Sequence, residues 1–270
     1  MYLDTNIPLW SSYLLTGILS SFFSGLLGIG GGLVIIPALM FIFAHFHVVD
    51  SQNLMHLVIG TSLASSILNL VFSVRAHHKK GNVRWSVFYI MCPGVLIGTL
   101  LVGPHLMSAL SGNTLKTIFG VSCLFFSIQM IYPRKNSDAP EKLPGKVIMT
   151  LLGIITGTLS VLLGLAGGAI IGTALNYYHM EMRRIVGTTA SVTLILATAG
   201  TIGLMTVSYH LSDLPPDSIG FIYWPALVGI VISSPFFAPL GVKVAQRLPV
   251  HLLKKMFAAF VLIIGLKMLL

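Results

Sequence analysis

Two glycine clusters inside long apolar segments are the residues whose type and spacing could most directly bind a ligand. Segment 28–32 reads Gly-Ile-Gly-Gly-Gly, and segment 164–168 reads Gly-Leu-Ala-Gly-Gly. A break at such a cluster starts a new half-helix, whose first N–H groups have no intrahelical partner and can bind an anion. The sequence therefore predicts two backbone anion sites, formed by Gly30, Gly31, Gly32, Gly167 and Gly168.

A second motif follows each cluster in the same order and supplies hydroxyl groups. Segment 60–62 reads Gly-Thr-Ser, and segment 187–189 reads Gly-Thr-Thr. Hydroxyl groups can donate hydrogen bonds to an oxyanion, although small residues also serve close helix packing in membranes. We expect these side chains to add donors to the anion sites: Thr61, Ser62, Thr188, Thr189 and Ser191.

The acidic residues all lie at the ends of apolar segments or in loops: Asp4, Asp50, Asp138, Glu141, Glu181, Asp213 and Asp217. Carboxylates embedded in a membrane usually mark proton relays or cation sites. Their absence here favours an anion held by neutral donors, and no metal site is predicted. His56 could handle a proton near neutral pH, and Asn69 could line the path. An interfacial position for His56 and interhelical hydrogen bonding for Asn69 are the ordinary alternatives.

The composition excludes an ordinary soluble enzyme, a disordered chain and a coiled coil. Of 270 residues, 55% are hydrophobic and 9% are charged, whereas roughly a quarter are charged in soluble domains. The chain is therefore predicted to be an all-α integral membrane protein. The net charge of +9 would suggest nucleic acid in a soluble protein. Here we expect the cations in cytoplasmic loops, and the expected partners are membrane lipid and no nucleic acid.

Eight apolar segments are separated by polar loops. Two of them exceed the roughly 20 residues of a simple span, and both contain a glycine cluster, so each is predicted to be a broken helical hairpin. Each hairpin precedes three ordinary spans, which divides the chain into repeats 1–136 and 137–270. The first repeat has hairpin 11–44 and spans 52–74, 85–107 and 114–132. The second has hairpin 147–178 and spans 185–209, 219–242 and 250–270.

The placement of charge decides how the two repeats are oriented. If each long segment crossed the membrane once, three charged loops of the second half would violate the positive-inside rule. If each is a hairpin, the halves become inverted, and every strongly basic loop lies inside: 75–84, 134–146, 183–184 and 243–255. We therefore predict inverted repeats with both termini outside. The number of crossings in each half leaves open whether each hairpin turns within the bilayer or crosses it fully.

These motifs resemble the TauE/SafE family of sulfite exporters and permeases. The likeness rests on SGLLGIGGG at 24–32, VIIP at 34–37 and IGTSLA at 59–64, and it covers essentially the whole chain in order. Segments 164–168 and 187–189 match the second half of the family pattern, with Ala166 in place of a glycine. The resemblance implies a carrier in the bacterial cytoplasmic (inner) membrane for sulfite, thiosulfate or an organosulfonate.

The sequence thus predicts a secondary transporter of a small sulfur-containing anion, with no enzymatic activity and no cofactor. A passive anion channel is one alternative. A membrane-embedded thiol or sulfur-relay protein is another, and Cys92 and Cys123 are the only thiols that it could use. The particular anion, the direction of transport, the coupling ion and the oligomeric state stay open.

Overall fold

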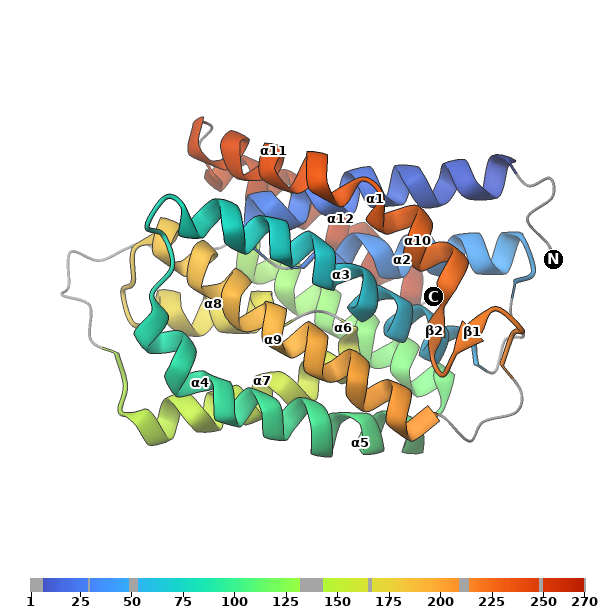
Figure 1. The fold of residues 1–270 in the computed structure, drawn as a ribbon, viewed down its shortest axis with the longest axis horizontal. Coiled ribbons are helices and arrows are strands. Elements are labelled where there is room, and N and C mark those ends of the chain that lie inside the picture. The colour runs from blue at the N-terminus through green and yellow to red at the C-terminus, as the bar shows by residue number, and fades with distance from the viewer. Residues whose placement is uncertain are drawn as a thin grey trace.

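The protein is an α-helical membrane bundle in the computed structural model, which describes residues 7–28, 30–48, 53–131, 143–164, 167–208, 214–247 and 250–269. Long helices lie side by side along one axis (Figure 1). Among the described residues, four helices have the length and hydropathy of membrane spans, and one bent pair makes a fifth. The expected all-α membrane fold is confirmed.

The first half of the chain contains one short helix after a long one, then longer spans. Its elements are α1 (Ile7–Leu27), α2 (Gly32–His45), α3 (Leu54–His78), α4 (Trp85–Ile97), the π-helical turn η1 (Gly98–Val102), α5 (Gly103–Ala109) and α6 (Gly112–Ile131). The stretch from α4 through α5 is one continuous apolar span, Trp85–Ala109.

The second half follows the same order with one addition. Its elements are α7 (Lys146–Leu163), α8 (Gly168–Tyr177), α9 (Met182–Ser208), β1 (Ser218–Ile219), β2 (Ile222–Tyr223), α10 (Trp224–Val231), α11 (Ser234–Arg247) and α12 (Val250–Leu269). Strands β1 and β2 form a small antiparallel hairpin.

Segment 219–242, expected as one simple span, instead begins in β1 and β2 and continues as two helices bent by 50°. Proline explains the break between α10 and α11. Pro235 has no backbone N–H, so it cannot donate to the carbonyl of Val231 one helical turn earlier.

The helices of the two halves contact one another in matched pairs. Helix α1 packs on α11 and α10, and α7 packs on α4 and α5. The two remaining pairs join counterparts directly: α3 packs on α9, and α6 packs on α12. The core of the bundle is therefore the α3–α9 pair, which the two hairpins flank. The division into inverted repeats stays a prediction.

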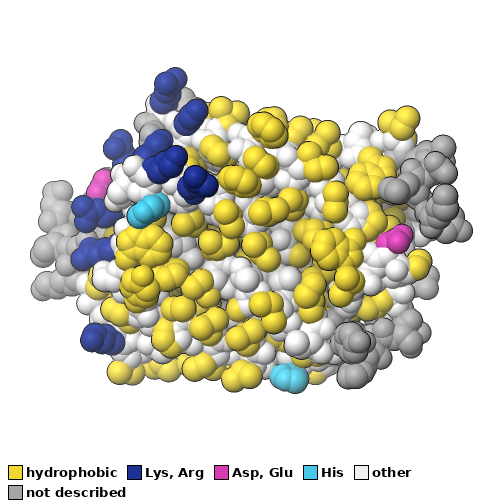
Figure 2. Space-filling model, viewed as in Figure 1, with side chains coloured by type: hydrophobic (Ala, Val, Ile, Leu, Met, Phe, Trp, Pro, Cys, Tyr) yellow, Lys and Arg dark blue, Asp and Glu magenta, His cyan; other side chains and the backbone are white. Residues whose placement is uncertain are grey.

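Basic side chains gather at one end of the bundle, on the left in Figure 2. This basic end is formed where α3 and α11 finish and α4, α7 and α9 begin (Figure 1), and it carries Lys79, Lys80, Arg84, Arg184 and Lys243. Helix α1 begins, and β1 and β2 lie, toward the opposite end. The broad side between the two ends is covered mainly by hydrophobic side chains, as expected of a surface that faces lipid.

Candidate functional site

The first hairpin turns at buried glycines inside the bundle. After α1 ends, Gly28, Gly30 and Gly31 adopt left-handed backbone conformations with φ of 70°, 79° and 83°, which side chains other than glycine rarely adopt. Helix α2 then begins at Gly32, and the carbonyl of Gly31 accepts from the N–H groups of Val34 and Ile35 at 2.9 and 3.0 Å.

The second hairpin repeats this geometry. Gly164 and Gly167 have φ of 59° and 63°, and α8 begins at Gly168. The carbonyl of Gly167 accepts from the N–H groups of Ile170 and Ile171, both at 3.1 Å. Helices α2 and α8 have 14 and 10 residues, so they span about 21 and 15 Å. Both are shorter than the roughly 30 Å hydrocarbon core, so neither helix is long enough to cross it alone.

Equivalent positions surround the two turns, with one chemical difference. A Cβ on Gly31 would contact Ser20 of α1 and lie 3.3 Å from Asn69 Nδ2 of α3. A Cβ on Gly167 would contact Thr156 of α7 and Leu196 of α9. Thr156 aligns with Ser20, and Leu196 aligns with Asn69, when the glycine clusters and the Gly-Thr motifs are superposed without gaps. The first turn therefore faces an amide where the second faces a leucine.

Asn69 is the centre of a buried polar cluster. Its Oδ1 accepts from Ser21 Oγ of α1 at 2.6 Å and from Ser234 Oγ of α11 at 2.5 Å. Ser21 also lies 3.2 Å from Ser233 Oγ. All four residues are at most 3% exposed. Asn69 Nδ2, by contrast, has no hydrogen-bond partner within the described ranges. The cluster thus presents a fixed donor toward the first turn.

A polar stripe runs along one face of α3 through Asn69. Its members are spaced three or four residues apart, as neighbours on one helix face must be, and all are buried: Ser62, Ser66, Asn69, Ser73 and His77. At one end of the stripe, Ser62 Oγ donates to the carbonyl of Gly164 in the second turn at 3.2 Å. At the other, His77 Nε2 lies 3.4 Å from the Gly25 carbonyl near the basic end. The stripe therefore connects both hairpin turns.

The matching face of α9 is only half polar. It carries Thr189 and Thr193, then Leu196, Gly200 and Leu204 at the positions of Asn69, Ser73 and His77. The hydroxyls of Thr189 and Thr193 are buried and have no partner among the residues described. The Ser160 hydroxyl of α7, which a Cβ on Gly167 would contact, is also buried and has no partner among the residues described. The second turn thus has hydroxyl donors beside it but no amide.

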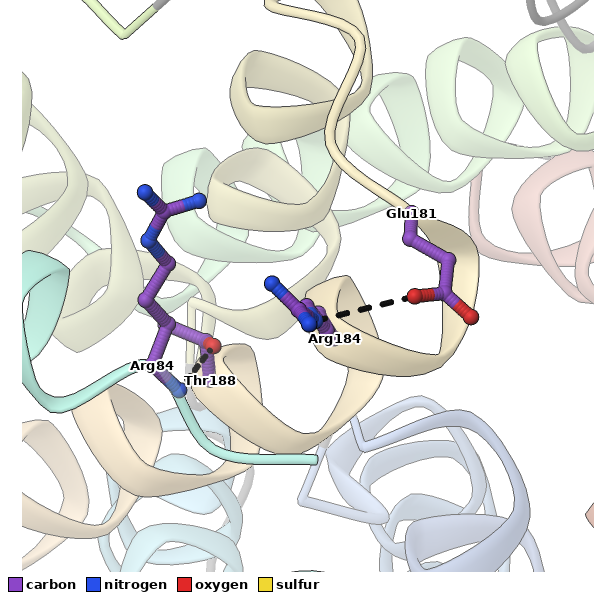
Figure 3. A network of polar contacts seen from close by, with 4 residues as sticks. All are labelled: Arg84, Glu181, Arg184 and Thr188. Atoms are coloured by element: carbon purple, nitrogen blue, oxygen red, sulfur yellow. Dashed lines mark hydrogen bonds and ion pairs between the residues drawn. The ribbon is translucent and has the colours of Figure 1, made fainter. Parts of the chain in front are cut away.

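Thr61 and Thr188 lie away from the turns, against the segments that lead into α10 and α4. Thr61 Oγ1 accepts from the N–H of Tyr223 at 2.9 Å, and Thr188 Oγ1 accepts from the N–H of Arg84 at 2.9 Å. Figure 3 shows the Arg84–Thr188 contact beside the exposed ion pair of Arg184 Nε with Glu181 Oε2, 3.6 Å long. Each threonine joins its own half of the chain to the other half.

The glycines of the same motif allow the backbone of the neighbouring segment to approach the helix closely. A Cβ on Gly60 would collide with the carbonyl of Phe221, and one on Gly187 would collide with the carbonyl of Asn82. The Gly-Thr motif therefore fits a helix against a loop: glycine admits the loop backbone, and threonine accepts its N–H group. The sequence alone had offered substrate donation and helix packing for this motif.

The remaining predicted site residues are scattered. Ser191 Oγ donates to the Gly187 carbonyl of its own helix at 3.0 Å. His56 Nε2 lies 3.1 Å from the Leu110 carbonyl, and its ring stacks on Phe221. His56 and Asn69 are 13 residues apart on α3, a separation of about 20 Å. The structure therefore brings Gly31 and Asn69 together and leaves His56 outside this cluster.

The sequence reading missed the serines that hold Asn69. Ser21 belongs to the polar pattern SSFFSG at 20–25, which marks α1 as a helix buried in protein. Ser233 and Ser234 follow an apolar segment and gave no signal of a contact with α3. Their role depends on the α11–α3 and α1–α11 contacts, which only the folded chain reveals.

In the described part of the chain, no group of three or more His, Cys, Asp and Glu residues could hold a metal ion. Cys92 of α4 is half-buried, Cys123 of α6 is fully buried, and both are free.

The fold defines a multi-pass all-α membrane protein with two glycine-turned hairpins, a construction used by secondary transporters. The family model "Sulfite exporter TauE/SafE" matches residues 13–268, and the chain belongs to this family of membrane transporters.

Curated relatives carry matching names. A "Probable membrane transporter protein" of Haemophilus influenzae is 30% identical over 94% of this chain and 96% of its own length. One of Methanocaldococcus jannaschii is 29% identical over 95% of this chain and 92% of its own length. No solved structure matches the chain significantly.

Proposed function

We propose that this protein is a secondary transporter that moves a small sulfur-containing anion, such as sulfite, thiosulfate or an organosulfonate, across the bacterial cytoplasmic membrane. The observation that carries the proposal is the Asn69 amide. Its Nδ2 is buried, has no partner among the described residues, and lies beside Gly31 at the start of α2. A buried donor without a partner is costly, and a bound oxyanion would satisfy it.

The chemistry around Asn69 favours an anion. The N-terminal end of α2 carries the positive end of the helix dipole and N–H groups without intrahelical partners. Ser24 and Ser73 add buried hydroxyls that have no partner within the described residues. The residues described in contact with Asn69 are all uncharged, so no carboxylate there would repel an anion or attract a cation. Sulfite and sulfonate oxygens accept the hydrogen bonds that such donors offer.

An inverted repeat would explain how the site opens to each side in turn. The reciprocal contacts support it: Gly28 of the first turn meets Val186 of α9, and Gly164 of the second turn meets Ile59 of α3. Val186 and Ile59 align with each other when the Gly-Thr motifs are superposed. In this proposal one repeat rocks against the other about the α3–α9 contact, and the polar stripe of α3 carries the anion between the turns.

The proposed orientation follows from the basic end. Cations concentrate on cytoplasmic loops, so the basic end would face the cytoplasm and both termini would lie outside. The relatives are named as probable membrane transporters, which supports transport as the function. The passive channel and the thiol relay, left open by the sequence, become outcomes of the tests.

Reconstitution into liposomes tests the proposal. The purified protein should mediate saturable uptake of at least one of radiolabelled sulfite, thiosulfate, taurine or sulfoacetate. Unlabelled substrate inside the vesicles should accelerate uptake, because a carrier exchanges substrate across the membrane. Conductance without this acceleration would indicate a channel, and the absence of flux for all four anions would contradict the substrate class.

A further inference from the structure

A cavity with a basic rim lies between α3 and α11 at the basic end, separate from the Asn69 cluster. It has a volume of about 420 Å³ and lies between the last turns of the two helices. Four cations line it: Arg75, Lys79 and Lys80 from α3 and the loop after it, and Lys243 from α11. No acidic residue is among the described residues of the lining.

Lys80 and Lys243 are close enough to repel one another. Burial lowers the pKa of Lys80, and the charge of Lys243 lowers it further. A phosphate group between these side chains would offset the repulsion with charge-assisted hydrogen bonds. The charge of the cavity therefore selects an anion.

The rest of the lining is apolar, which a free inorganic anion would not use. Phe72, Ala76, Pro239 and Val242 line the cavity behind the cations. This surface continues along both helices toward the middle of the membrane. On α3, Leu68 and Val71 are 39% and 38% exposed, and on α11, Phe236 and Leu240 are 74% and 44% exposed.

The two faces meet at the cavity, because Arg75 and Lys79 of α3 and Lys243 of α11 all line it. Positions 68, 71, 75 and 79 share one face of α3, and positions 236, 240 and 243 share one face of α11. Both helices run toward the basic end (Figure 1). Each face is therefore apolar toward the middle of the membrane and basic at its end. This pattern complements a phospholipid, whose acyl chains are apolar and whose acidic headgroup is negatively charged.

We propose that the cavity between α3 and α11 is a specific binding site for an acidic phospholipid of the leaflet at the basic end. The phosphate lies among Arg75, Lys79, Lys80 and Lys243, and the acyl chains follow the apolar faces of α3 and α11. Basic pockets between transmembrane helices have the chemistry that recognises such headgroups.

Binding of fluorescent phosphatidylglycerol to the full-length protein in non-ionic detergent tests this site. The double variant Lys79→Gln/Lys243→Gln removes two cations from the cavity. Since each basic residue near a lipid headgroup contributes about fivefold, we expect binding to weaken about 30-fold. The single variant Lys243→Gln should weaken binding about fivefold.

A matched control removes the same charge from the same end of the molecule. Arg183 and Lys255 are exposed and lie outside the cavity lining, so Arg183→Gln/Lys255→Gln should bind phosphatidylglycerol as the unmodified protein does. Phosphatidylcholine with the same acyl chains should not compete, because its headgroup is neutral overall.

Three results would overturn the proposal. Equal weakening in the control pair would mean general surface attraction instead of a site. Equal binding of phosphatidylcholine would mean that the cations do not distinguish an acidic headgroup from a neutral one. Full competition by millimolar inorganic phosphate or sulfite, with no contribution from acyl chains, would assign the cavity to a free anion. None of these readouts depends on transport activity.

Discussion

Ser21 Oγ of α1 donates a 2.6 Å hydrogen bond to Asn69 Oδ1 of α3, and this contact orients the amide at the first hairpin turn. Ser234 donates to the same oxygen from α11, so the Asn69 oxygen is held from two helices while its Nδ2 lies near Gly31. Three segments far apart in the sequence therefore fix one donor.

The threonines of the Gly-Thr motif should affect stability. Thr61→Val removes the acceptor of the Tyr223 N–H, and Thr188→Val removes the acceptor of the Arg84 N–H. Leaving such a donor unpaired costs about 1–3 kcal/mol, so each variant should lose thermal stability in detergent, measured by size-exclusion chromatography after heating.

Two further variants define that threonine result. Thr61→Ser keeps the oxygen and should retain stability. Thr198→Val is the control, because the exposed Thr198 hydroxyl donates to the Leu194 carbonyl of its own helix. Full stability in both Thr61→Val and Thr188→Val would show that the threonines do not hold the loops.

Glycine at the first turn should be required for more than its backbone conformation. Gly31 and Gly81 both have left-handed φ, 83° and 69°, but a Cβ on Gly31 would lie 2.9 Å from the Ser20 carbonyl oxygen, whereas one on Gly81 would meet nothing within 4 Å. Gly31→Ala and Gly81→Ala should share a backbone cost of about 1–2 kcal/mol. Only Gly31→Ala should also lose anion flux in liposomes, since it moves the turn against α1. Equal flux in the two variants would contradict a role for the first turn.

Much of the first turn could be predicted from the sequence, because a glycine cluster in the middle of an over-long apolar segment indicates a break in the helix. The starts of α2 and α8 follow directly from Gly31 and Gly167. Asn69 was recognised as polar at membrane depth, but its partners were not, since Ser21 and Ser234 are brought to it only by tertiary packing. Thr61 could not be assigned from the sequence. A hydroxyl in an apolar helix looks the same in sequence whether it binds a ligand or accepts a hydrogen bond from another segment of the backbone.

The polar stripe of α3 should be reachable from the side of the basic end. In a background without native cysteines, Ser73→Cys should react with a membrane-impermeant maleimide added on that side, and a transported organosulfonate should slow the reaction. Leu70→Cys is the control, because the Leu70 side chain packs in an apolar cluster with Ala190 and Ala197 of α9. Equal labelling of both positions, or none at Ser73→Cys, would argue against a path along this stripe.

Removal of both thiols should leave transport unchanged. Cys123 is fully buried, and Cys92 is half-buried on a different helix, so neither is expected to contact the anion. Cys92→Ala/Cys123→Ala should therefore retain flux, measured at matched protein density in liposomes. Loss of flux with normal folding would instead favour the thiol relay.

Anion flux through Asn69→Asp in liposomes tests whether the Asn69 Nδ2 donor binds the anion. Aspartate keeps an oxygen for Ser21 and Ser234, so the three-helix contact and the fold should survive, but it replaces the Nδ2 donor with a negative charge beside Gly31. Gln129→Leu is the control, since it removes a second amide, one that accepts from Thr173 at 2.6 Å. The account predicts that Asn69→Asp folds but neither binds nor transports the anion, while Gln129→Leu transports it. Undiminished transport by folded Asn69→Asp would contradict the account.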